Sequence, residues 1–198
     1  MKNIIFDLGS VICSGKPVDI LKNLNLEENT YNELKRFFEN SWKEINLGIG
    51  TLEDKYNECN FPKEYDQYKD YLVCYYKYRK LNIELIGLID MLKENDYNVY
   101  ILSNNNKECS TYYKNNGMFN NIDGWVVSCD YGISKPDSKL FDIILEKYNL
   151  IPEESYFIDD KERNIEEAKK HGIKTYQFSE LDDINKLYLD MKFNGINI

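Results

Sequence analysis

The chain has 198 residues and a formal net charge of −9, and 42% of its residues are hydrophobic. That length and apolar content are enough for one sizeable core, with room for a small accessory domain. The acidic balance argues against nucleic acid as a partner, because contacts to a phosphate backbone need a basic surface.

Hydropathy and cysteine content indicate the cellular compartment of the chain. No stretch approaches the ~18 uninterrupted apolar residues of a membrane span, and the start lacks the basic lead and apolar run of a signal peptide. The five cysteines are an odd number without a C-x-x-C pair, which argues against a zinc site or a disulfide framework. We therefore expect a cytoplasmic protein with free thiols and no membrane partner, either monomeric or homodimeric.

The first predicted element is a short buried strand over Asn3–Phe6. An apolar run of four to eight residues that ends at a glycine turn is typical of a buried parallel strand. Asp7 follows it directly, and the chain then turns through Leu8 and Gly9. We expect Asp7 at the carboxyl end of a strand, where open α/β sheets bind their ligands.

Residues 16–80 carry helix signals and no strand pattern. Thr30 and Glu33 have the spacing of a capping box, and an apolar stripe with helical periodicity follows at Leu34, Phe38 and Trp42. This pattern predicts a helix that begins at Thr30.

Two further helices are expected in the same segment. Thr51 follows a break at Gly48–Gly50 and is expected to begin one of them, and residues 65–79 would form the other. We therefore predict an all-helical domain at residues 16–80, called the helical insertion below. The core would consist of residues 1–15 and 81–198.

Strands and helices alternate over the rest of the chain. Apolar stripes at helical spacing cover residues 85–92 and 141–148, and a last helix is expected over Asn164–His171, before Gly172. Four more strands are predicted, at Asn98–Leu102, Trp125–Ser128, Ser155–Ile158 and, after the glycine stop, Lys174–Phe178. The alternation predicts an α/β fold, a doubly wound Rossmann-like parallel sheet with the helical insertion after its first strand.

Polar side chains follow several of these strands. Asp7 follows the first strand, Ser103 the second, and Asp159 and Asp160 the fourth, while Lys135 lies in the loop after the third. In a parallel sheet these strand ends meet at one edge. Carboxylates brought together without a neutralising partner repel, so the cluster indicates a hard cation such as Mg²⁺, which prefers oxygen ligands.

A carboxylate, a hydroxyl, an ammonium group and a metal together suit phosphoryl transfer. Asp7 can attack phosphorus and form an aspartyl phosphate, as carboxylate nucleophiles do in some ATPases. The other groups would stabilise charge on the phosphoryl oxygens.

Each residue also has a simpler interpretation when taken alone. Asp159 and Asp160 could cap a helix N-terminus, Lys135 could be a solvated loop lysine, and Ser103 could be a turn residue. His171, the only histidine, has no sequence partner that indicates a Ser/His/Asp triad.

The set of motifs resembles the haloacid dehalogenase-like hydrolases. The matching segments are 6–9 (FDLG), 101–104 (ILSN), 132–137 (GISKPD) and 157–160 (FIDD), followed by Asn164. The resemblance covers the whole chain, with the helical insertion where the family inserts a helical cap. The residues of the matching segments are most similar to those of the phosphatase branch that includes sugar-phosphate phosphatases of the glucose-1-phosphate type.

The resemblance also implies roles for individual residues. Asp7 would be the nucleophile, Ser103 and Asn104 would bind the phosphoryl group, and Lys135 would orient both Asp7 and the phosphate. The metal ligands it implies for Mg²⁺ are Asp7, Asp159, Asp160 and the backbone carbonyl of Gly9, with Asn164 as a supporting residue. The partner would be a small phosphorylated metabolite.

Gly9 is a departure from the family pattern. Phosphatases of the family usually carry a second aspartate two residues after the nucleophile, and it protonates the leaving group. Without this general acid, which typically contributes ~10² to 10⁴-fold in rate, we expect a substrate whose leaving group needs little protonation. A sugar 1-phosphate, an acyl phosphate or an aryl phosphate would fit.

Two other functions are compatible with Gly9. A 2-haloacid dehalogenase releases halide without a proton, although it needs no metal and gives the paired aspartates no purpose. A binding or regulatory protein could keep the fold without efficient chemistry.

Residues that recognise the substrate, called substrate-reading residues below, are expected in or beside the helical insertion. The candidates are Ser14, Lys16, Trp42, Lys43 and a hinge at Gly48–Gly50.

Overall fold

The computed structural model of the chain describes residues 1–14, 16–179 and 184–198. At its centre lies a sheet of five parallel strands in the order β3-β2-β1-β4-β5, which confirms the predicted α/β fold. The strands are β1 (Asn3–Phe6), β2 (Asn98–Ser103), β3 (Gly124–Val127), β4 (Ser155–Asp159) and β5 (Lys174–Gln177). β3 begins and ends one residue earlier than the sequence predicts, because Ser128 already starts a 3₁₀ turn.

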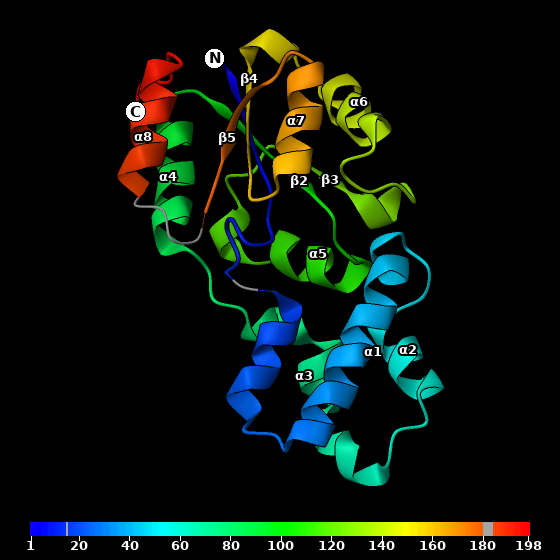
Figure 1. The fold of residues 1–198 in the computed structure, drawn as a ribbon. Helices are drawn as coiled ribbons and strands as arrows, with labels where there is room; N and C mark the ends of the chain where they lie inside the picture. The colour runs from blue at the N-terminus through cyan, green and yellow to red at the C-terminus, as the bar shows by residue number, and fades with distance from the viewer. Residues whose placement is uncertain (15, 180–183) are drawn as a thin grey trace.

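Helices cover both faces of the sheet (Figure 1). Side chains of β1 alternate, so Ile4 and Phe6 join one apolar cluster and Ile5 joins the other. The first cluster includes residues of α4 (Ile83–Glu94), α5 (Lys107–Lys114) and α8 (Ile184–Phe193). The second includes residues of α6 (Ser138–Lys147) and α7 (Glu162–Lys170). Both faces of the central strand are therefore dry, as a parallel sheet requires.

Between β1 and α4 the described chain is helical. Its elements are α1 (Glu28–Asn46), α2 (Leu52–Glu58) and α3 (Lys69–Val73), with 3₁₀ segments η1 (Pro17–Leu24), η2 (Lys63–Tyr68) and η3 (Tyr75–Tyr78). They lie together beyond one end of the sheet (Figure 1). No helix among the described residues is long and apolar enough to cross a membrane.

The ends of two helices test the capping predictions. α1 begins at Glu28 with Glu27 at its N-cap, so the prediction that it begins at Thr30 is wrong. Thr30 lies within the first turn, and its hydroxyl accepts a hydrogen bond from Tyr65. The prediction for Thr51 is confirmed, because its hydroxyl accepts from the backbone N–H of Asp54 at 3.0 Å and its own N–H donates to the Asp54 carboxylate.

The helix predicted over residues 65–79 is broken into η2, α3 and η3. The chain leaves helical geometry at Cys74, where φ is −108° and ψ is 29°. This break turns Tyr75 inward, with its ring 5.4 Å from that of Trp42 and its hydroxyl donating to Asn105 Oδ1 at 3.0 Å. Local periodicity does not show the break because the contacts that require it come from distant segments.

The C-terminal part also differs from the prediction. α7 begins at Glu162, two residues before the predicted start, and ends before Gly172, which has a φ of +84°. The prediction that it is the last helix is wrong, because α8 follows β5. α8 buries only Leu187 and Met191 at i, i+4, and such a narrow stripe gives a weak sequence signal.

The chain enters and leaves the helical insertion along two adjacent segments. Ser14 N–H donates to the Lys80 carbonyl at 2.8 Å, and Asn82 N–H donates to the Ile12 carbonyl at 2.8 Å. Between these bonds, Cys13 pairs with residue 81 in an antiparallel bridge. These two segments, residues 12–14 and 80–82, are called the crossings below. They form a short antiparallel ladder beside the end of β1.

At its other side, the helical insertion contacts the core through the end of α1. The Ser128 hydroxyl donates to the Asn46 carbonyl at 2.5 Å. Gly48 has a φ of +78°, and a Cβ there would lie 2.5 Å from the carbonyl oxygen of Cys129. Gly48, a candidate hinge residue by sequence, is thus packed against the core.

Alanine substitutions at the two glycines after α1 are expected to differ in cost. Gly50 has a φ of +71°, but a Cβ there meets nothing closer than 3.8 Å. In both variants the left-handed backbone is expected to lower the free energy of unfolding by about 1–2 kcal/mol. In Gly48→Ala the collision with Cys129 lowers it by about 1–3 kcal/mol more. Urea unfolding measures both free energies, and equal losses would show that this contact does not need glycine.

Candidate active site

The carboxyl ends of β1, β2 and β4 bring the predicted polar residues together. Phe6 pairs with Ile158 in the sheet, so the next residues, Asp7 and Asp159, lie at the same level. Ser103 ends the neighbouring strand β2. All three side chains are buried, with exposed fractions of 4% for Asp7, 0% for Asp159 and 2% for Ser103. The sheet geometry therefore produces the cluster that the strand order predicts.

Lys135 supplies the positive charge of this cluster. Its ammonium lies 3.1 Å from Asp7 Oδ1 and 2.6 Å from Asp159 Oδ2, and donates to the Leu102 carbonyl at 2.7 Å. The residue is only 2% exposed, so the interpretation as a solvated loop lysine is wrong. A buried ammonium held by two carboxylates is a fixed part of the site.

Asn104 holds the loop that carries Lys135. The backbone N–H of Lys135 donates to Asn104 Oδ1 at 2.7 Å, and Asn104 Nδ2 donates to the Lys135 carbonyl at 2.9 Å. This reciprocal pair uses the amide that the resemblance assigns to phosphate binding. Ser103 differs, because no hydrogen-bond partner contacts its hydroxyl among residues 1–14, 16–179 and 184–198. The Ser103 hydroxyl is therefore the better placed of the two for a phosphoryl oxygen.

Asp159 is fully engaged with the protein. Its Oδ1 accepts from Lys161 N–H and Asn164 Nδ2, both at 2.8 Å, and its Oδ2 accepts from Asn164 Nδ2 at 2.9 Å and from Lys135. α7 has Lys161 at its N-cap and no side-chain cap, so the structure does not support the interpretation of the aspartate pair as a helix cap. Asp159 orients Lys135, and Asn164 supports it.

Asp7 is held in a defined orientation. Its Oδ1 accepts from the backbone N–H of Leu8 at 2.7 Å and from Lys135. Burial raises the pKa of Asp7 and the charge of Asp159 adds to this rise, while the Lys135 ammonium opposes it. For Lys135, burial would lower the pKa, but the charges of Asp159 and Asp7 outweigh it and raise the pKa above its ordinary value. Lys135 is thus protonated, and a further cation beside Asp7 would lower the pKa of its carboxyl, as Lys135 does.

The cluster fits a divalent cation. Asp7, Asp159 and Asp160 each offer a carboxylate oxygen, and these atoms lie within 4.8 Å of one another. Two ammonium groups face these three carboxylates, the buried one of Lys135 and that of Lys161 at 3.9 Å from Asp160 Oδ1, so the formal charge is −1. Asp160 Oδ1 is buried, and no described residue is its hydrogen-bond partner. Oxygen donors with an excess of negative charge suit Mg²⁺.

Gly9 lies in a closed loop beside these carboxylates. Cys13 N–H donates to the Leu8 carbonyl and Ser10 N–H to the Cys13 carbonyl, both at 2.7 Å. These two bonds fix the loop and do not use the Gly9 carbonyl. The predicted metal contact of that carbonyl stays a prediction.

Most of the predicted substrate-reading residues have structural contacts of their own. Ser14 bonds to the Lys80 carbonyl through both its N–H and its hydroxyl, and the backbone N–H of Lys16 donates to the Asp19 carboxylate. Trp42 packs on Tyr75, and Lys43 is exposed on α1. The substrate contacts of these residues stay predictions.

Sequence reasoning missed Arg79. Its Nη1 and Nη2 both lie 3.8 Å from the point where a Cβ of Gly9 would be. An arginine 70 positions from Gly9 gives no local signal, because only the ladder between the two crossings brings it there.

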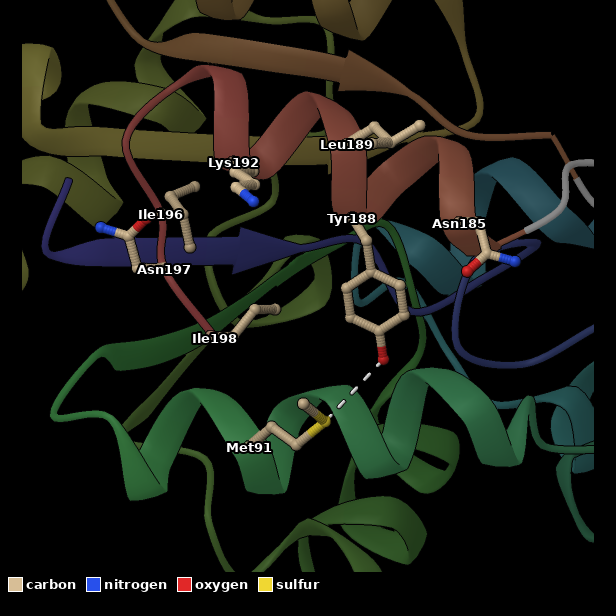
Figure 2. A pocket seen from close by; sticks show the side chains of 8 residues that line it. All are labelled: Met91, Asn185, Tyr188, Leu189, Lys192, Ile196, Asn197 and Ile198. Carbon is tan, nitrogen blue, oxygen red and sulfur yellow. Dashed lines mark hydrogen bonds between the residues drawn. The ribbon is translucent and has the colours of Figure 1, made fainter.

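Two cavities differ in their position relative to this cluster. A cavity of about 470 Å³ adjoins it, lined by Asp160 together with Ser10, Gln177, Phe178 and Ser179. A larger cavity of about 720 Å³ lies between α4 and α8, where Figure 2 shows Tyr188 directed toward Met91. The larger cavity includes none of the clustered carboxylates, so we locate the chemistry by side chains and not by volume.

Comparison with known proteins agrees with the fold and with the motifs. The profile of the haloacid dehalogenase-like hydrolases matches residues 4–178. A D-ribitol-5-phosphate phosphatase from Bacteroides thetaiotaomicron is 27% identical over 194 residues, which cover 89% of this chain and 91% of that protein.

Solved structures share the fold at lower identity. A HAD family enzyme from Bacteroides thetaiotaomicron, solved in complex with magnesium and inorganic phosphate, has a TM-score of 0.73 at 21% identity and covers 95% of this chain and 99% of its own. The L-2-haloacid dehalogenase from Xanthobacter autotrophicus has a TM-score of 0.66 at 14% identity, covering 100% of this chain and 85% of its own. With its family profile matched over most of its length, the chain belongs to the haloacid dehalogenase-like hydrolases.

Proposed function

We propose that the chain is a Mg²⁺-dependent phosphomonoester hydrolase that acts on a small phosphorylated metabolite, with sugar phosphates favoured. The observation that carries the proposal is the buried Lys135 between Asp7 and Asp159, next to the Oδ1 of Asp160, which no described residue hydrogen-bonds. The similarity to a D-ribitol-5-phosphate phosphatase and to an enzyme crystallised with magnesium and phosphate supports it.

Each residue of the site would have a distinct role in the reaction. Asp7 attacks phosphorus and becomes an aspartyl phosphate, which water then hydrolyses. Lys135 holds Asp7 in position and, with Ser103, stabilises the phosphoryl oxygens. Residues 16–80 would act as a cap domain over a core of residues 1–15 and 81–198, and exclude water from the site.

Three groups are proposed to hold Mg²⁺: the carboxylates of Asp7 and Asp160 and the carbonyl of Gly9. Asp159 contributes through Lys135, because hydrogen bonds already occupy both of its oxygens. The bound ion would neutralise charge on the phosphate and on the carboxylates that face it.

A panel of phosphorylated metabolites, assayed with Mg²⁺ and with EDTA, tests the function. We expect phosphate release that EDTA abolishes and Mg²⁺ restores, with sugar 1-phosphates and ribitol 5-phosphate among the first compounds to examine. Release of halide from 2-chloropropionate in the presence of EDTA would instead identify a dehalogenase. A protein without any turnover that also fails to capture beryllium fluoride with Mg²⁺ at Asp7 would be a binding protein.

Asp160→Asn is expected to weaken Mg²⁺ binding by more than tenfold, about 1.4 kcal/mol. The variant loses one anionic ligand, while Asp159 keeps its hydrogen bonds to Lys135 and Asn164. The measurement is the rise of the melting temperature with Mg²⁺ concentration, which does not depend on activity. Glu162→Gln, an exposed acidic neighbour, is the control, and equal Mg²⁺ affinity in the two variants would contradict the assignment of Asp160.

A further inference from the structure

The absence of a side chain at position 9 has no backbone or packing cause. Gly9 does not have the left-handed φ that favours glycine, and a Cβ there would meet nothing closer than 3.8 Å. The two atoms at that distance are both guanidinium nitrogens of Arg79. Glycine at this position therefore leaves the guanidinium facing the loop that follows Asp7.

Arg79 is held at this place by the crossing that leads into the helical insertion. Its Nη2 donates to the Cys13 carbonyl at 2.7 Å, and its Nε donates to the Ser14 carbonyl at 3.3 Å. The side chain is partly buried at the boundary between the core and the helical insertion. A guanidinium bound to two carbonyls has little freedom to move, so its charge has a defined position.

The charges of Arg79 and Asp7 act on the same neighbouring group. Burial raises the pKa of the Cys13 thiol to about 11, with Arg79 opposing this rise and Asp7 adding to it. Cys13 therefore lies within electrostatic reach of both side chains. Arg79 thus contacts the loop that follows Asp7 at Gly9 and Cys13, from the side of the helical insertion.

Attack by Asp7 determines where the substrate's leaving oxygen lies. In an in-line displacement the attacking and leaving oxygens lie on opposite sides of phosphorus, so the leaving group points away from Asp7. Lys135 and Ser103 belong to the sheet edge, whereas Arg79 lies at the boundary with the helical insertion. Arginine stays protonated and cannot act as the acid, but it can stabilise an oxyanion through charge and hydrogen bonds.

We propose that Arg79 stabilises the leaving oxygen as an anion in place of a proton donor, so that the enzyme acts on phosphate esters with acidic leaving groups. The inference rests on the proposed phosphatase function. An oxygen of Asp7 bonds to phosphorus as the ester P–O bond breaks, and the electron pair of that bond stays on the leaving oxygen beside Arg79. That oxygen takes a proton from water. The hydroxide so formed balances the proton released when water hydrolyses the aspartyl phosphate.

A series of aryl phosphates with increasing leaving-group pKa tests the role of Arg79. In the wild type we expect log kcat to depend weakly on that pKa, and in Arg79→Gln to depend steeply. The loss in Arg79→Gln would be roughly 10²–10³-fold for the least acidic phenol, as for the loss of an oxyanion donor, and small for the most acidic. Arg79→Lys retains the charge and is expected to recover part of the loss.

The controls separate the role of Arg79 from folding and from the proposed function. Arg163→Gln makes the same substitution at an exposed position and should leave kcat unchanged for the whole series. A uniform loss across the series, or a loss explained by urea unfolding of Arg79→Gln, would mean that Arg79 only links the crossings and would overturn the inference. If the wild type releases phosphate from no ester, it is the proposed function that fails.

Discussion

Asp7→Asn is expected to lower kcat for phosphate release by ~10⁴-fold or more, as removal of a nucleophile does in other covalent mechanisms. An amide has nearly the shape of the carboxylate but cannot attack phosphorus. The Oδ atom can still accept the Leu8 N–H at the end of β1. Phosphate release from the best substrate of the panel, with Mg²⁺ present, is the measurement.

Stability is the control for this variant. Asp7→Asn removes one negative charge from a cluster in which three carboxylates face two ammonium groups, so we expect the free energy of unfolding without Mg²⁺ to stay the same or to rise. Asp142→Asn, the same substitution at an exposed position on α6, should leave activity unchanged. An Asp7→Asn protein that retains a tenth of the wild-type rate would exclude Asp7 as nucleophile.

Lys135→Met is expected to lower the free energy of unfolding at pH 7 by about 3–5 kcal/mol and to remove activity. Removing one partner of a buried ion pair costs about that much because the other partner stays buried and uncompensated. Here two carboxylates, those of Asp7 and Asp159, lose their common cation. Urea unfolding without Mg²⁺ measures the loss, and Lys139→Met, an exposed lysine close in sequence, is the control.

The stability loss of Lys135→Met should be smaller at pH 4 than at pH 7. Burial raises the pKa of Asp7 already in the wild type, where Lys135 opposes the rise, so the variant has a still higher value. The cost of ionising Asp7 in the folded variant is full above its folded-state pKa and decreases as the pH falls from that value toward the ordinary value of 3.8, where the unfolded chain also takes up the proton. A loss of equal size at both pH values would show that the charge of Asp7 is not its cause.

Local sequence was sufficient to predict the sheet and the composition of the site. Except for β5 (KTYQ), each strand is a short apolar run that ends at or just before a polar residue, and a parallel sheet brings such ends to one edge. Asp7, Ser103, Lys135 and Asp159 therefore lie together as predicted, although Asp7 and Asp159 are far apart in the chain. The prediction needed only the order of the strands and the residues that follow them.

The orientation of individual side chains depends on contacts that no local pattern contains. The amide of Asn104 is turned toward the backbone of Lys135, 31 residues away. Arg79 reaches the Asp7 loop only because the two crossings lie side by side. Tyr75 breaks its helix because its hydroxyl bonds to Asn105 in the core. Such residues are identified from the three-dimensional contacts alone.

The bond between Ser128 and Asn46 has a consequence for access to the site. The ladder of crossings attaches the helical insertion at one side, and the bond from Ser128 to Asn46 attaches it at the other (Figure 1). The same Ser128 hydroxyl accepts from the N–H of Asn105, on the loop that follows Ser103. A rotation of the insertion about the ladder would have to break the bond to Asn46 together with the bond from Tyr75 to Asn105. Both bonds lead to Asn105, directly or through Ser128, so the insertion is tied to the loop that follows Ser103.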